Sequence, residues 1–577
     1  MVRDSLPDVW ARIQLIGSAT PFDGLSMRSA KSAASAHKKE CGTMAQEDKT
    51  HTTAAPGGLV FSTDYELGQD NIRPFGLDIH NPVFVISAAV IVSFVVIALL
   101  NQQATADFFG WLRPFLTSTF DWFLMMSVNF MVLFCLFLAL SPLGSVKIGG
   151  KDAVPDYSYS GWIAMLFSAG IGIGLLFFGV LEPMYYSLPE LKALPLGADP
   201  SVAGNERMGI VGTVFHWGLS GWAVYVVVGL CLAIFCYNLN LPLTLRSAFY
   251  PIFGDRVWGW PGHIIDTLAV FATLFGLTTS LGLGAQQVAA GLNDVFGIPT
   301  SNMLTVGLIL GITAVALVSV LLGMDAGVKR LSEINMVMAV LLFAFVLLVG
   351  PTLKLISTFG LVLKDYVVNF VALSNPFGRE DLGYMHGWTT FYWAWWIAWS
   401  PFVGMFIARI SRGRTVREFV FCVLIAPSLV CALWMTVFGG FALEQLAGGY
   451  TGVKEVVAAY KPELSLFRML DQLPLYSIVA PISLVLIVVF FVTSSDSGSL
   501  VIDTITAGGK MDAPVAQRVF WCTFEGLVAI ALLLGGGLNA LQGAAVSMGI
   551  PFTVVVLAMC WCLYLALKSE HLKLSDE

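Results

Sequence analysis

The chain alternates long apolar runs with short polar segments from Pro82 almost to its C-terminus. Each run is about 20 residues long, which is the length that an α-helix needs to cross the hydrocarbon core of a bilayer. We count twelve runs, at residues 82–100, 119–141, 161–180, 211–237, 263–285, 303–323, 334–352, 388–408, 418–442, 474–494, 517–536 and 543–567. The pattern therefore predicts an all-α integral membrane protein with twelve transmembrane helices.

Two terminal segments flank this membrane domain, which we place at residues 81–567. Residues 1–80 are polar and contain no apolar core of the kind that a signal peptide needs, so we expect a disordered cytoplasmic N-terminal tail. Met44 could equally be the true start, in which case residues 1–43 would not be translated. At the other end, residues 568–577 would form a short cytoplasmic tail.

One further segment, at residues 355–373, is less apolar than the twelve runs and carries Lys364 and Asp365 in its middle. A charge pair is costly at the centre of a bilayer, so we predict an amphipathic helix that lies along the outer surface. If this segment crossed the membrane instead, there would be thirteen spans and the C-terminus would lie outside.

The distribution of positive charge indicates the orientation of the spans. With both termini in the cytoplasm, the five internal loops carry twelve Lys and Arg residues, and the six external loops, which are longer in total, carry nine. The densest group is ARISRGRTVRE at residues 408–418. Cytoplasmic loops of membrane proteins carry an excess of Lys and Arg, so this distribution favours cytoplasmic termini.

The amino-acid composition supports the prediction of a membrane protein and argues against several functional classes. Of the 577 residues, 57% are hydrophobic and 12% are charged, whereas soluble proteins carry about 25% charged residues. A net charge of −7 provides no basic field for nucleic acid. The nine Cys form no CxxC pair and the seven His are scattered, which disfavours a disulfide framework, a zinc site and a membrane di-iron or haem enzyme.

Three glycines at every second position mark the third run, which contains Gly170, Gly172 and Gly174 within SAGIGIG. Each glycine disfavours a helix by about 1 kcal/mol relative to alanine, so we expect the helix to loosen here. Backbone groups that are freed at membrane depth are tolerated only where they line a cavity or a site. Close helix packing through Gly170 and Gly174, which are four residues apart, explains the glycines equally well.

The fourth run presents a cluster of aromatic residues, Trp217, Trp222 and Tyr225. At 100° per residue they fall within an arc of about 140°, so one face of a helix can hold all three.

The eighth run, WTTFYWAWWIAWSPF, is denser in aromatic residues. Tyr392, Trp396 and Trp399 follow the i, i+4, i+7 spacing and share one stripe, and Pro401 is expected to break or kink the helix just below them. Tryptophan in membrane proteins usually anchors the lipid interface, but the later indoles of this run lie nearer its middle than its end. Indole faces around a cavity attract a diffuse cation, so we predict an aromatic box for a quaternary ammonium group.

The tenth run ends in hydroxyl residues that include Thr493 and Ser494, followed by Asp496. Hydroxyl groups in a helix can donate to carbonyl groups of the preceding turn, which would explain them without a ligand. Alternatively, Thr493 and Ser494 offer oxygen ligands that would form a small hard-cation site together with carbonyl groups freed in the third run. Asp496 would be either a cap at the cytoplasmic end of the helix or part of an inner gate.

Four strings in this order and spacing, SAGIGIG, FHWxxxxWxxY, YWAWWIAWSPFVGMFIARISRGR and TSSDS, resemble the betaine/carnitine/choline transporter (BCCT) family over about residues 80–567. The resemblance implies a fold like that of amino-acid/sodium symporters. Two inverted repeats of five spans, at about residues 161–352 and 388–567, would follow two extra helices. The substrate site would lie at mid-membrane between the third, fourth and eighth spans and work by alternating access.

The resemblance also implies roles for particular residues. The aromatic box maps to Trp217, Trp222, Tyr225 and Trp396, with Trp395 and Trp399 as candidates on the exit path, and the substrate also meets the backbone of Gly170, Gly172 and Gly174. The family's sodium ligands map to the carbonyl groups of Ser168, Ile171 and Phe490 and to the hydroxyl groups of Thr493 and Ser494. We expect no cofactor beyond the coupling ion, which is sodium, with a proton as the alternative.

Three departures from the family pattern change the expectation. Sodium-coupled members use two threonines one turn apart in the fifth span; here Thr273 is present but Leu277 offers no oxygen, which puts a second sodium site in doubt. Gly174 is an aspartate in many choline carriers, and a zwitterion that carries its own counter-charge does not need that acid, so Gly174 favours glycine betaine or a sulfonium analogue. The short segment after the last span gives no reason to expect osmotic activation through a long basic helix.

The residues and the resemblance together predict a secondary transporter of a bacterial inner membrane that imports a quaternary ammonium or sulfonium compatible solute with sodium, for osmoprotection. Its expected partners are this small zwitterionic or cationic methylated solute and membrane lipid, with a homotrimer as the assembly that the resemblance allows. Two alternatives stay open: a proton-coupled or exchange carrier for choline or carnitine, and a transport-deficient membrane sensor of the solute. An enzyme is disfavoured because no metal cluster or nucleophile constellation is present in the sequence.

Overall fold

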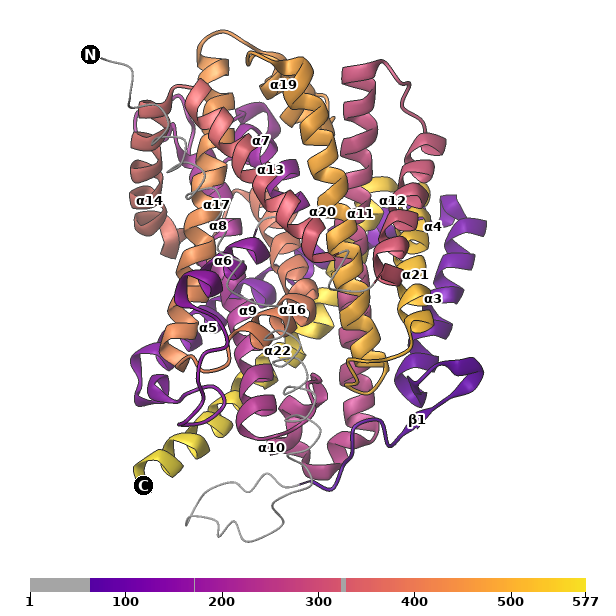
Figure 1. Ribbon diagram of the computed structural model, residues 1–577. Helices are drawn as coiled ribbons and strands as arrows, with labels where there is room; N and C mark the ends of the chain where they lie inside the picture. Colours follow the sequence, from indigo (N-terminus) through magenta and orange to yellow (C-terminus); the bar gives the residue numbers. More distant parts are fainter. Residues whose placement is uncertain (1–62, 171, 323–327, 577) are drawn as a thin grey trace, which may run out of the picture.

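The computed structural model describes residues 63–576, except residue 171 and residues 323–327 (Figure 1). Nearly all the long elements are helices that run side by side. The helices are α3 (Asn81–Leu100), α4 (Gln102–Thr119), α5 (Asp121–Leu140), α6 (Tyr159–Gly170), α7 (Ile173–Tyr185), α8 (Met208–Trp217), α9 (Leu219–Ala233), α10 (Tyr250–Phe253), α11 (Trp260–Phe296), α12 (Asn302–Leu322), α13 (Val328–Val349), α14 (Thr352–Ser374), α15 (Leu382–Tyr384), α16 (Thr390–Ile410), α17 (Val416–Ala447), α18 (Gly452–Ala458), α19 (Ser465–Leu470), α20 (Tyr476–Thr506), α21 (Val515–Leu534) and α22 (Gly537–Asp576). The short helix α19 lies at one end of the bundle, and the C-terminus lies at the opposite end.

Eleven helical segments in the described part of the chain are long and apolar enough to cross a membrane. Ten of them coincide with predicted runs. The two predicted runs that this criterion leaves out, 161–180 and 388–408, are helical as well. The first is divided into α6 and α7, each too short by itself, and the second is α16, whose four indoles contribute little to mean hydropathy because the ring is amphipathic.

The eleventh segment is α14, which contains the residues for which we predict a surface helix. Only 17% of its most apolar window is buried inside the protein, the lowest share among the eleven segments. Its Asp365 accepts a hydrogen bond of 2.8 Å from Arg207 at the start of α8, so the charge in the middle of the helix is paired. By length and composition α14 could span a bilayer, and the surface location stays a prediction.

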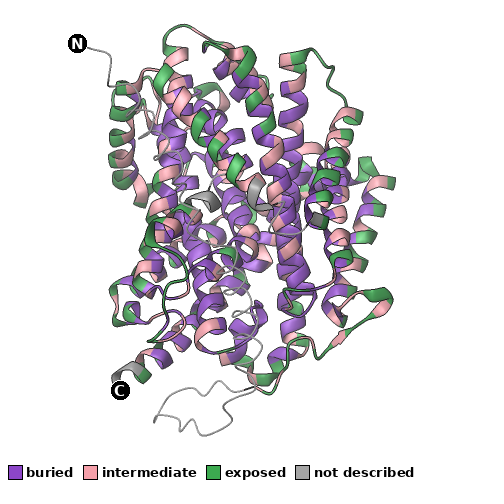
Figure 2. Ribbon diagram, viewed as in Figure 1, coloured by how far each residue is buried: buried purple, intermediate pink, exposed green. Residues whose placement is uncertain are grey.

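The inner helices are buried on all sides and the outer helices are not (Figure 2). In the segment Met208–Asn238, which contains α8 and α9, 94% of the most apolar window is buried. Helix α16 packs against α9, α11 and α22, which makes it the other central element. Side chains exposed on α5 and α14, such as Leu133 and Val371, are large and apolar, as contact with lipid requires.

Two central helices are interrupted at glycines. Gly172 is extended, with φ −155° and ψ −173°, and separates α6 from α7, so the predicted loosening of the third run is confirmed as a full break. A second interruption, which the sequence analysis missed, lies at Gly218 between α8 and α9. There the Leu219 N–H donates to the Tyr366 hydroxyl of α14 at 3.2 Å, so a neighbouring helix satisfies the backbone group that the break releases.

Helix α16, by contrast, continues through Pro401, where the sequence analysis expects a break or kink. Proline removes the N–H that would normally bond to the carbonyl group of Ile397. The Ser400 hydroxyl donates to that carbonyl oxygen at 2.7 Å and replaces the missing donor. The predicted break is therefore wrong, because the adjacent serine compensates for the proline.

The N-terminal end of the described chain differs from expectation. Residues 63–80, assigned above to a disordered tail, contain the antiparallel strands β1 (Asn71–Ile72) and β2 (Ile79–His80). This ribbon is fixed to the loop after α20, since Lys510 pairs with Asp78 at 2.8 Å and the Asn71 amide donates to the Ala507 carbonyl oxygen at 2.9 Å. The rest of the predicted tail lies outside the described residues. At the other end, residues 568–576 continue helix α22.

Candidate functional site

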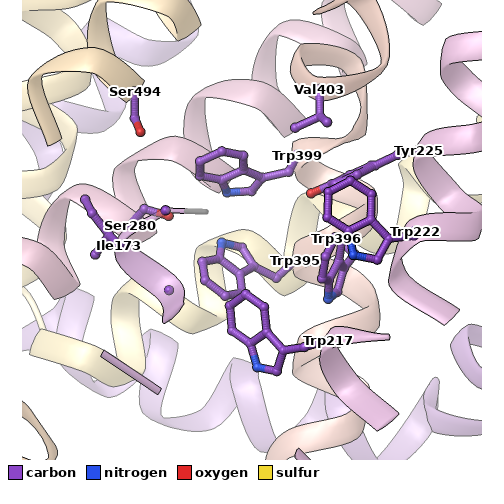
Figure 3. Close-up of a pocket in the computed structure, with 12 residues that line it drawn as sticks. Ile173, Trp217, Trp222, Tyr225, Ser280, Trp395, Trp396, Trp399, Val403 and Ser494 are labelled. Carbon is purple, nitrogen blue, oxygen red and sulfur yellow. The ribbon is translucent and has the colours of Figure 1, made fainter. Parts of the chain in front are cut away.

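A chamber lies between α7, α8, α9, α11, α16 and α20, close to the break at Gly172 (Figure 3). It holds about 560 Å³ of empty space, which includes space open to solvent. Its lining consists of Gly172, Ile173, Gly174, Trp217, Trp222, Tyr225, Ser280, Trp395, Trp396, Trp399, Val403 and Ser494. All six predicted aromatic residues therefore line one cavity, and none of the described residues around it is charged.

The aromatic rings gather on one side of the chamber, and Ile173, Ser280 and Ser494 lie on the other. Trp396 of α16 is the centre of the group. Its ring centroid lies 4.8 Å from that of Tyr225, 5.5 Å from that of Trp222 and 5.9 Å from that of Trp217. The predicted convergence of two aromatic helices is therefore confirmed, and the indoles are not lipid-interface anchors.

The indoles are held by their N–H groups. Trp396 Nε1 donates to the His216 carbonyl oxygen at 2.9 Å, beside the interruption at Gly218. Trp399 and Trp395 both donate to the Gly276 carbonyl oxygen of α11, at 2.9 and 3.3 Å. Each of these three rings is fixed through its polar edge.

Two glycines allow the indoles to approach the backbone. A Cβ atom at Gly174 would collide with the Trp217 ring, and one at Gly221 would collide with the Trp396 ring. The third of the glycines in the GIGIG segment is thus required by close packing against an indole. Gly172 therefore marks the break, and Gly174 accommodates the indole ring of Trp217.

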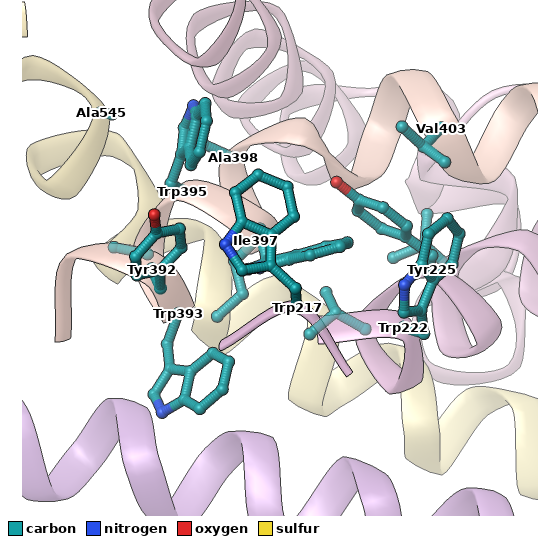
Figure 4. Packing of buried hydrophobic residues seen from close by; sticks show 14 of the residues in the cluster. Trp217, Trp222, Tyr225, Tyr392, Trp393, Trp395, Ile397, Ala398, Val403 and Ala545 are labelled. Atoms are coloured by element: carbon teal, nitrogen blue, oxygen red, sulfur yellow. The ribbon is translucent and has the colours of Figure 1, made fainter. Parts of the chain in front are cut away.

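Behind the aromatic group, Glu182 of α7 is fully buried and accepts hydrogen bonds from three helical segments. Trp217 Nε1 donates to its Oε1 at 2.8 Å, and the Tyr392 hydroxyl donates to the same oxygen. Tyr186 and the His216 ring lie 2.8 and 3.1 Å from Oε2. The carboxylate therefore fixes the orientation of the Trp217 ring. Figure 4 shows Trp217 and Tyr392 within the cluster of buried hydrophobic residues.

The sequence analysis missed Glu182, although its sequence position carries a signal. The residue follows directly on an apolar run, in GVLEP, and an ionisable residue at membrane depth is by itself a reason to expect a functional role. Ser280 and Val403 of the chamber were also missed, and nothing in their sequence context distinguishes them from other residues of apolar helices.

The structure shows the positions of only some of the predicted sodium ligands. Ser494 lines the chamber, and Thr493 and Phe490 line an adjoining cavity of about 840 Å³ that shares Gly172, Trp399 and Ser494 with it. Thr493 Oγ1 donates to the carbonyl oxygens of Val489 and Phe490 at 3.0 and 3.1 Å, which is the local bonding that the sequence analysis weighed as the simple explanation. Ser168 and Gly170 belong to α6, and Ile171 lies outside the described residues.

Asp496 is neither a helix cap nor exposed. It lies inside α20, which continues to Thr506, and it accepts a hydrogen bond of 2.6 Å from Ser319 of α12. Its buried position therefore excludes the capping role that the sequence analysis left open.

Comparison with known proteins decides the family. The family model described as BCCT, betaine/carnitine/choline family transporter, matches residues 82–572. The chain belongs to the BCCT family. Its members are transporters, which confirms the resemblance seen in the sequence and the prediction that this protein is not an enzyme.

Three relatives of this BCCT protein come from Vibrio parahaemolyticus. A glycine betaine/proline/choline transporter is 55% identical over 89% of this chain and 96% of its own length. Glycine betaine transporter 1 is 52% identical over 89% and 98% of the two chains, and a glycine betaine/proline/choline/ectoine transporter is 50% identical over 89% and 91%. Among solved structures, a manganese transporter mutant of Eremococcus coleocola aligns at a TM-score of 0.40 and 15% identity over 74% of this chain and 90% of its own, which is too weak a likeness to support an argument.

In this BCCT protein, the support that Glu182 gives to Trp217 can be tested with two variants. We expect Glu182→Leu to lower the free energy of unfolding by about 3 kcal/mol or more, because each buried donor left without an acceptor costs about 1–3 kcal/mol. Glu182→Gln keeps an acceptor for the Trp217 N–H and should lose less. Thermal and denaturant unfolding in detergent measure both, with Glu444→Gln in a partly exposed ion pair as the control. Equal stability of the Leu variant and the wild type would contradict this role.

Proposed function

We propose that this BCCT protein imports a zwitterionic methylated solute, with glycine betaine as the first candidate, by sodium-coupled alternating access. The observation that carries the proposal is the group of four rings, Trp217, Trp222, Tyr225 and Trp396, around a chamber whose described lining has no charge. A permanent cation in such a chamber is stabilised by ring faces, backbone dipoles and the Ser280 and Ser494 hydroxyl oxygens, without an anionic side chain.

The methylated ammonium group would occupy the aromatic side of the chamber. Its charge is diffuse and weakly hydrated, so several indole faces can replace the water that it loses, at about 0.5–2 kcal/mol for each ring. The absence of a carboxylate among the described lining residues supports a zwitterion over choline, because a zwitterion brings its own negative charge.

The carboxylate of the solute would face the start of α7. Gly172, Ile173 and Gly174 line the chamber, and α7 begins at Ile173. The first N–H groups of a helix have no partners within the helix, and its N-terminus carries partial positive charge. A carboxylate bound there would therefore find unpaired donors, while the ammonium group contacts the rings.

Sodium would bind between α6 and α20, at the Ser168, Ile171 and Phe490 carbonyl groups and the Thr493 and Ser494 hydroxyl groups. Thr493 donates to carbonyl oxygens of its own helix, but a donating hydroxyl keeps lone pairs for a cation, so this bonding is compatible with the site. Sodium bound there would order the segment before α7 and so favour solute binding. Leu277 lies one helical turn from Thr273 and offers no oxygen ligand. This supports the transport of fewer sodium ions per solute than in family members that bind two.

The two cavities support an alternating-access cycle based on the five-plus-five inverted repeat that follows α3 and α5. The chamber adjoins the cavity lined by Ser332 and Asn335 of α13 and by Ser497 of α20. Toward α19, by contrast, the Phe178 ring packs on Trp217, Tyr392 and Trp395 at centroid distances of 5.6–6.2 Å and closes the chamber. With cytoplasmic termini, as the loop charges favour, this arrangement corresponds to an inward-directed state.

The names of the relatives support this substrate class. Glycine betaine is common to the names of the three transporters of Vibrio parahaemolyticus. Proline and ectoine, which occur in some of these names, are zwitterions too, whereas choline, which occurs in two of them, is a cation. We further propose that the chain crosses a bacterial inner membrane twelve times, with both termini in the cytoplasm. The proposed assembly is a homotrimer.

A second candidate function is proton-coupled or exchange transport of choline or carnitine. The observation that favours it is a pair of buried carboxylates, Asp496 and Glu525, which accept from Ser319 at 2.6 Å and from Ser495 at 2.8 Å. Carboxylates at membrane depth are groups that proton-driven carriers use. Uptake in sodium-free buffer under an imposed pH gradient would identify this alternative.

The aromatic box predicts the result of removing one ring. Trp396→Ala should raise the half-saturating concentration of glycine betaine in proteoliposomes by about tenfold or more, because a desolvated cation–π contact contributes about 2 kcal/mol. Trp561→Ala is the matched control, since this indole is 57% exposed on the outer face of α22. Unchanged uptake by the Trp396 variant would contradict the proposal.

The sodium site predicts a loss of ion dependence. Thr493→Ala combined with Ser494→Ala should raise the sodium concentration needed for half-maximal uptake by about tenfold, because two of five oxygen ligands are lost. Ser483→Ala is the control within the same helix, where the hydroxyl donates to the Val479 carbonyl oxygen at 2.9 Å. Identical sodium dependence in the double variant and in this control would rule out the site.

A further inference from the structure

The carboxylate of Glu182 lies one indole ring away from the chamber. Its side chain is fully buried, and its Oε1 accepts a hydrogen bond of 2.8 Å from Trp217 Nε1. The other end of the same indole reaches the chamber, because the six-membered ring of Trp217 lies against Gly174 and both residues belong to the chamber lining. The indole therefore connects the carboxylate to the place where the ammonium group is proposed to bind.

Four groups surround the two oxygens of this carboxylate. Besides Trp217, the Tyr392 hydroxyl donates to Oε1, the Tyr186 hydroxyl donates to Oε2 at 2.8 Å, and His216 Nδ1 lies 3.1 Å from Oε2. An ionised carboxylate has about four acceptor sites, whereas a neutral acid carries a proton that needs an acceptor of its own. Since hydrogen bonds to the charged form favour that form, this set of donors suits an ionised Glu182.

The His216 ring leaves this negative charge uncancelled. Its Nε2 lies 2.9 Å from Thr389 Oγ1, and the ring stacks on those of Tyr384 and Tyr392, at centroid distances of 4.9 and 4.6 Å. A neutral imidazole satisfies both of its nitrogens here, because Nδ1–H donates to Glu182 and Nε2 accepts from the Thr389 hydroxyl.

The described residues supply no other charge that would neutralise Glu182. None of the lysines and arginines among them forms an ion pair with it, and its recorded ionic contact is His216. Arg379, whose charge influences His216, is itself paired with Asp381 at 2.6 Å. A negative charge therefore stands behind the aromatic side of the chamber, although the described lining carries none.

Such a charge acts differently on the two classes of methylated solute. A net cation, such as choline or tetramethylammonium, is attracted as a whole. A zwitterion also brings a carboxylate, which the same charge repels, so the effects on its two ends partly cancel. For a separation of about 8 Å across an intervening indole and an effective dielectric constant of about 20, the attraction lowers the dissociation constant of a net cation by about tenfold or more.

The charge also favours one orientation of a bound zwitterion. Helix α7 begins at Ile173 and Glu182 lies nine residues later (173 to 182), which at 1.5 Å per residue is about 13 Å along the helix. The start of α7, where the solute would place its carboxylate, is therefore distant from Glu182, whereas the Trp217 ring is in direct contact with it. Glu182 thus draws the ammonium end toward the rings and leaves the carboxylate end at the helix start.

We propose that Glu182 is a specificity-determining residue, which acts through the Trp217 ring to raise the affinity of the chamber for a net cation relative to a zwitterion. This inference rests on the proposed function for the class of solute. The chamber accepts choline as well as glycine betaine, because Glu182 supplies part of the counter-charge that the lining lacks.

Competition binding to the purified full-length protein, with saturating sodium, tests the proposal. Choline or tetramethylammonium displaces labelled glycine betaine, and the readout is the dissociation constant of each cation divided by that of glycine betaine. We expect Glu182→Gln to raise this ratio by about tenfold, because the amide removes the charge but keeps an acceptor for Trp217. A purely structural effect would weaken all three ligands by the same factor and leave the ratio unchanged.

Two control variants separate the charge from the hydrogen bonds. Tyr392→Phe removes a donor from the same carboxylate oxygen but keeps the charge, so the ratio should not change. Glu444→Gln makes the same chemical substitution in a partly exposed ion pair, and should leave all three dissociation constants unchanged.

A second variant cancels the charge without altering Glu182. His216→Lys places a permanent cation beside the carboxylate, and should raise the ratio in the same direction as Glu182→Gln does. This variant decides the matter if Glu182→Gln does not fold.

Two results would overturn the role of Glu182 and leave the proposed function intact. One is a ratio that stays within about twofold of the wild-type value in both Glu182→Gln and His216→Lys. The other is a wild-type protein from which neither cation displaces glycine betaine. A wild-type protein that does not bind labelled glycine betaine at all would instead refute the proposed function, on which this inference rests.

Discussion

A permanent cation loses its hydration when it enters a membrane protein, and the protein must replace that stabilisation without water. In this chamber the described lining carries no charged side chain, and aromatic rings make up most of its side-chain surface, so the aromatic faces are the main candidates for this replacement. Ring faces attract a cation only if they are held toward it. Trp217, Trp396 and Trp399 are each held through the indole N–H, by Glu182, the His216 carbonyl oxygen and the Gly276 carbonyl oxygen respectively.

The broken helices belong to the same arrangement. A membrane-spanning helix normally satisfies all its own backbone groups, so a break is tolerated only where other groups bond to the released atoms. At Gly218, Tyr366 accepts from the Leu219 N–H, and Trp396 donates to a carbonyl oxygen beside the break. At Gly172, α7 begins beside the chamber, and the first N–H groups of a helix have no partner within it, so the proposed solute would place its carboxylate there.

Much of this architecture could be predicted from the sequence, because apolar runs and the 3.6-residue period fix which residues share a helix face. The convergence of Trp217 and Trp222 with Trp396 followed from that period together with the family resemblance. The break at Gly172 was indicated by three alternate glycines, whereas a single glycine at position 218 gave no comparable signal.

The remaining features depend on contacts between helices that are distant in sequence. Pro401 looked like a break, since the compensating bond from Ser400 depends on a side-chain orientation that a pattern does not reveal. Glu182 could have been noted as an acid beside an apolar run, but its partners on α8 and α16 could not. The order of residues 63–80 likewise arises from pairing with the loop after α20.

The most direct test of the cation–aromatic interaction is to replace Trp396 with tryptophans that carry one to four fluorine atoms on the ring, and to measure the dissociation constant of glycine betaine for each. Fluorine withdraws electron density from the ring face while it changes the shape of the ring little. If the ring face binds the ammonium group, the logarithm of the dissociation constant should rise in steps with the number of fluorine atoms. A dissociation constant that does not depend on fluorination would contradict this account of the chamber.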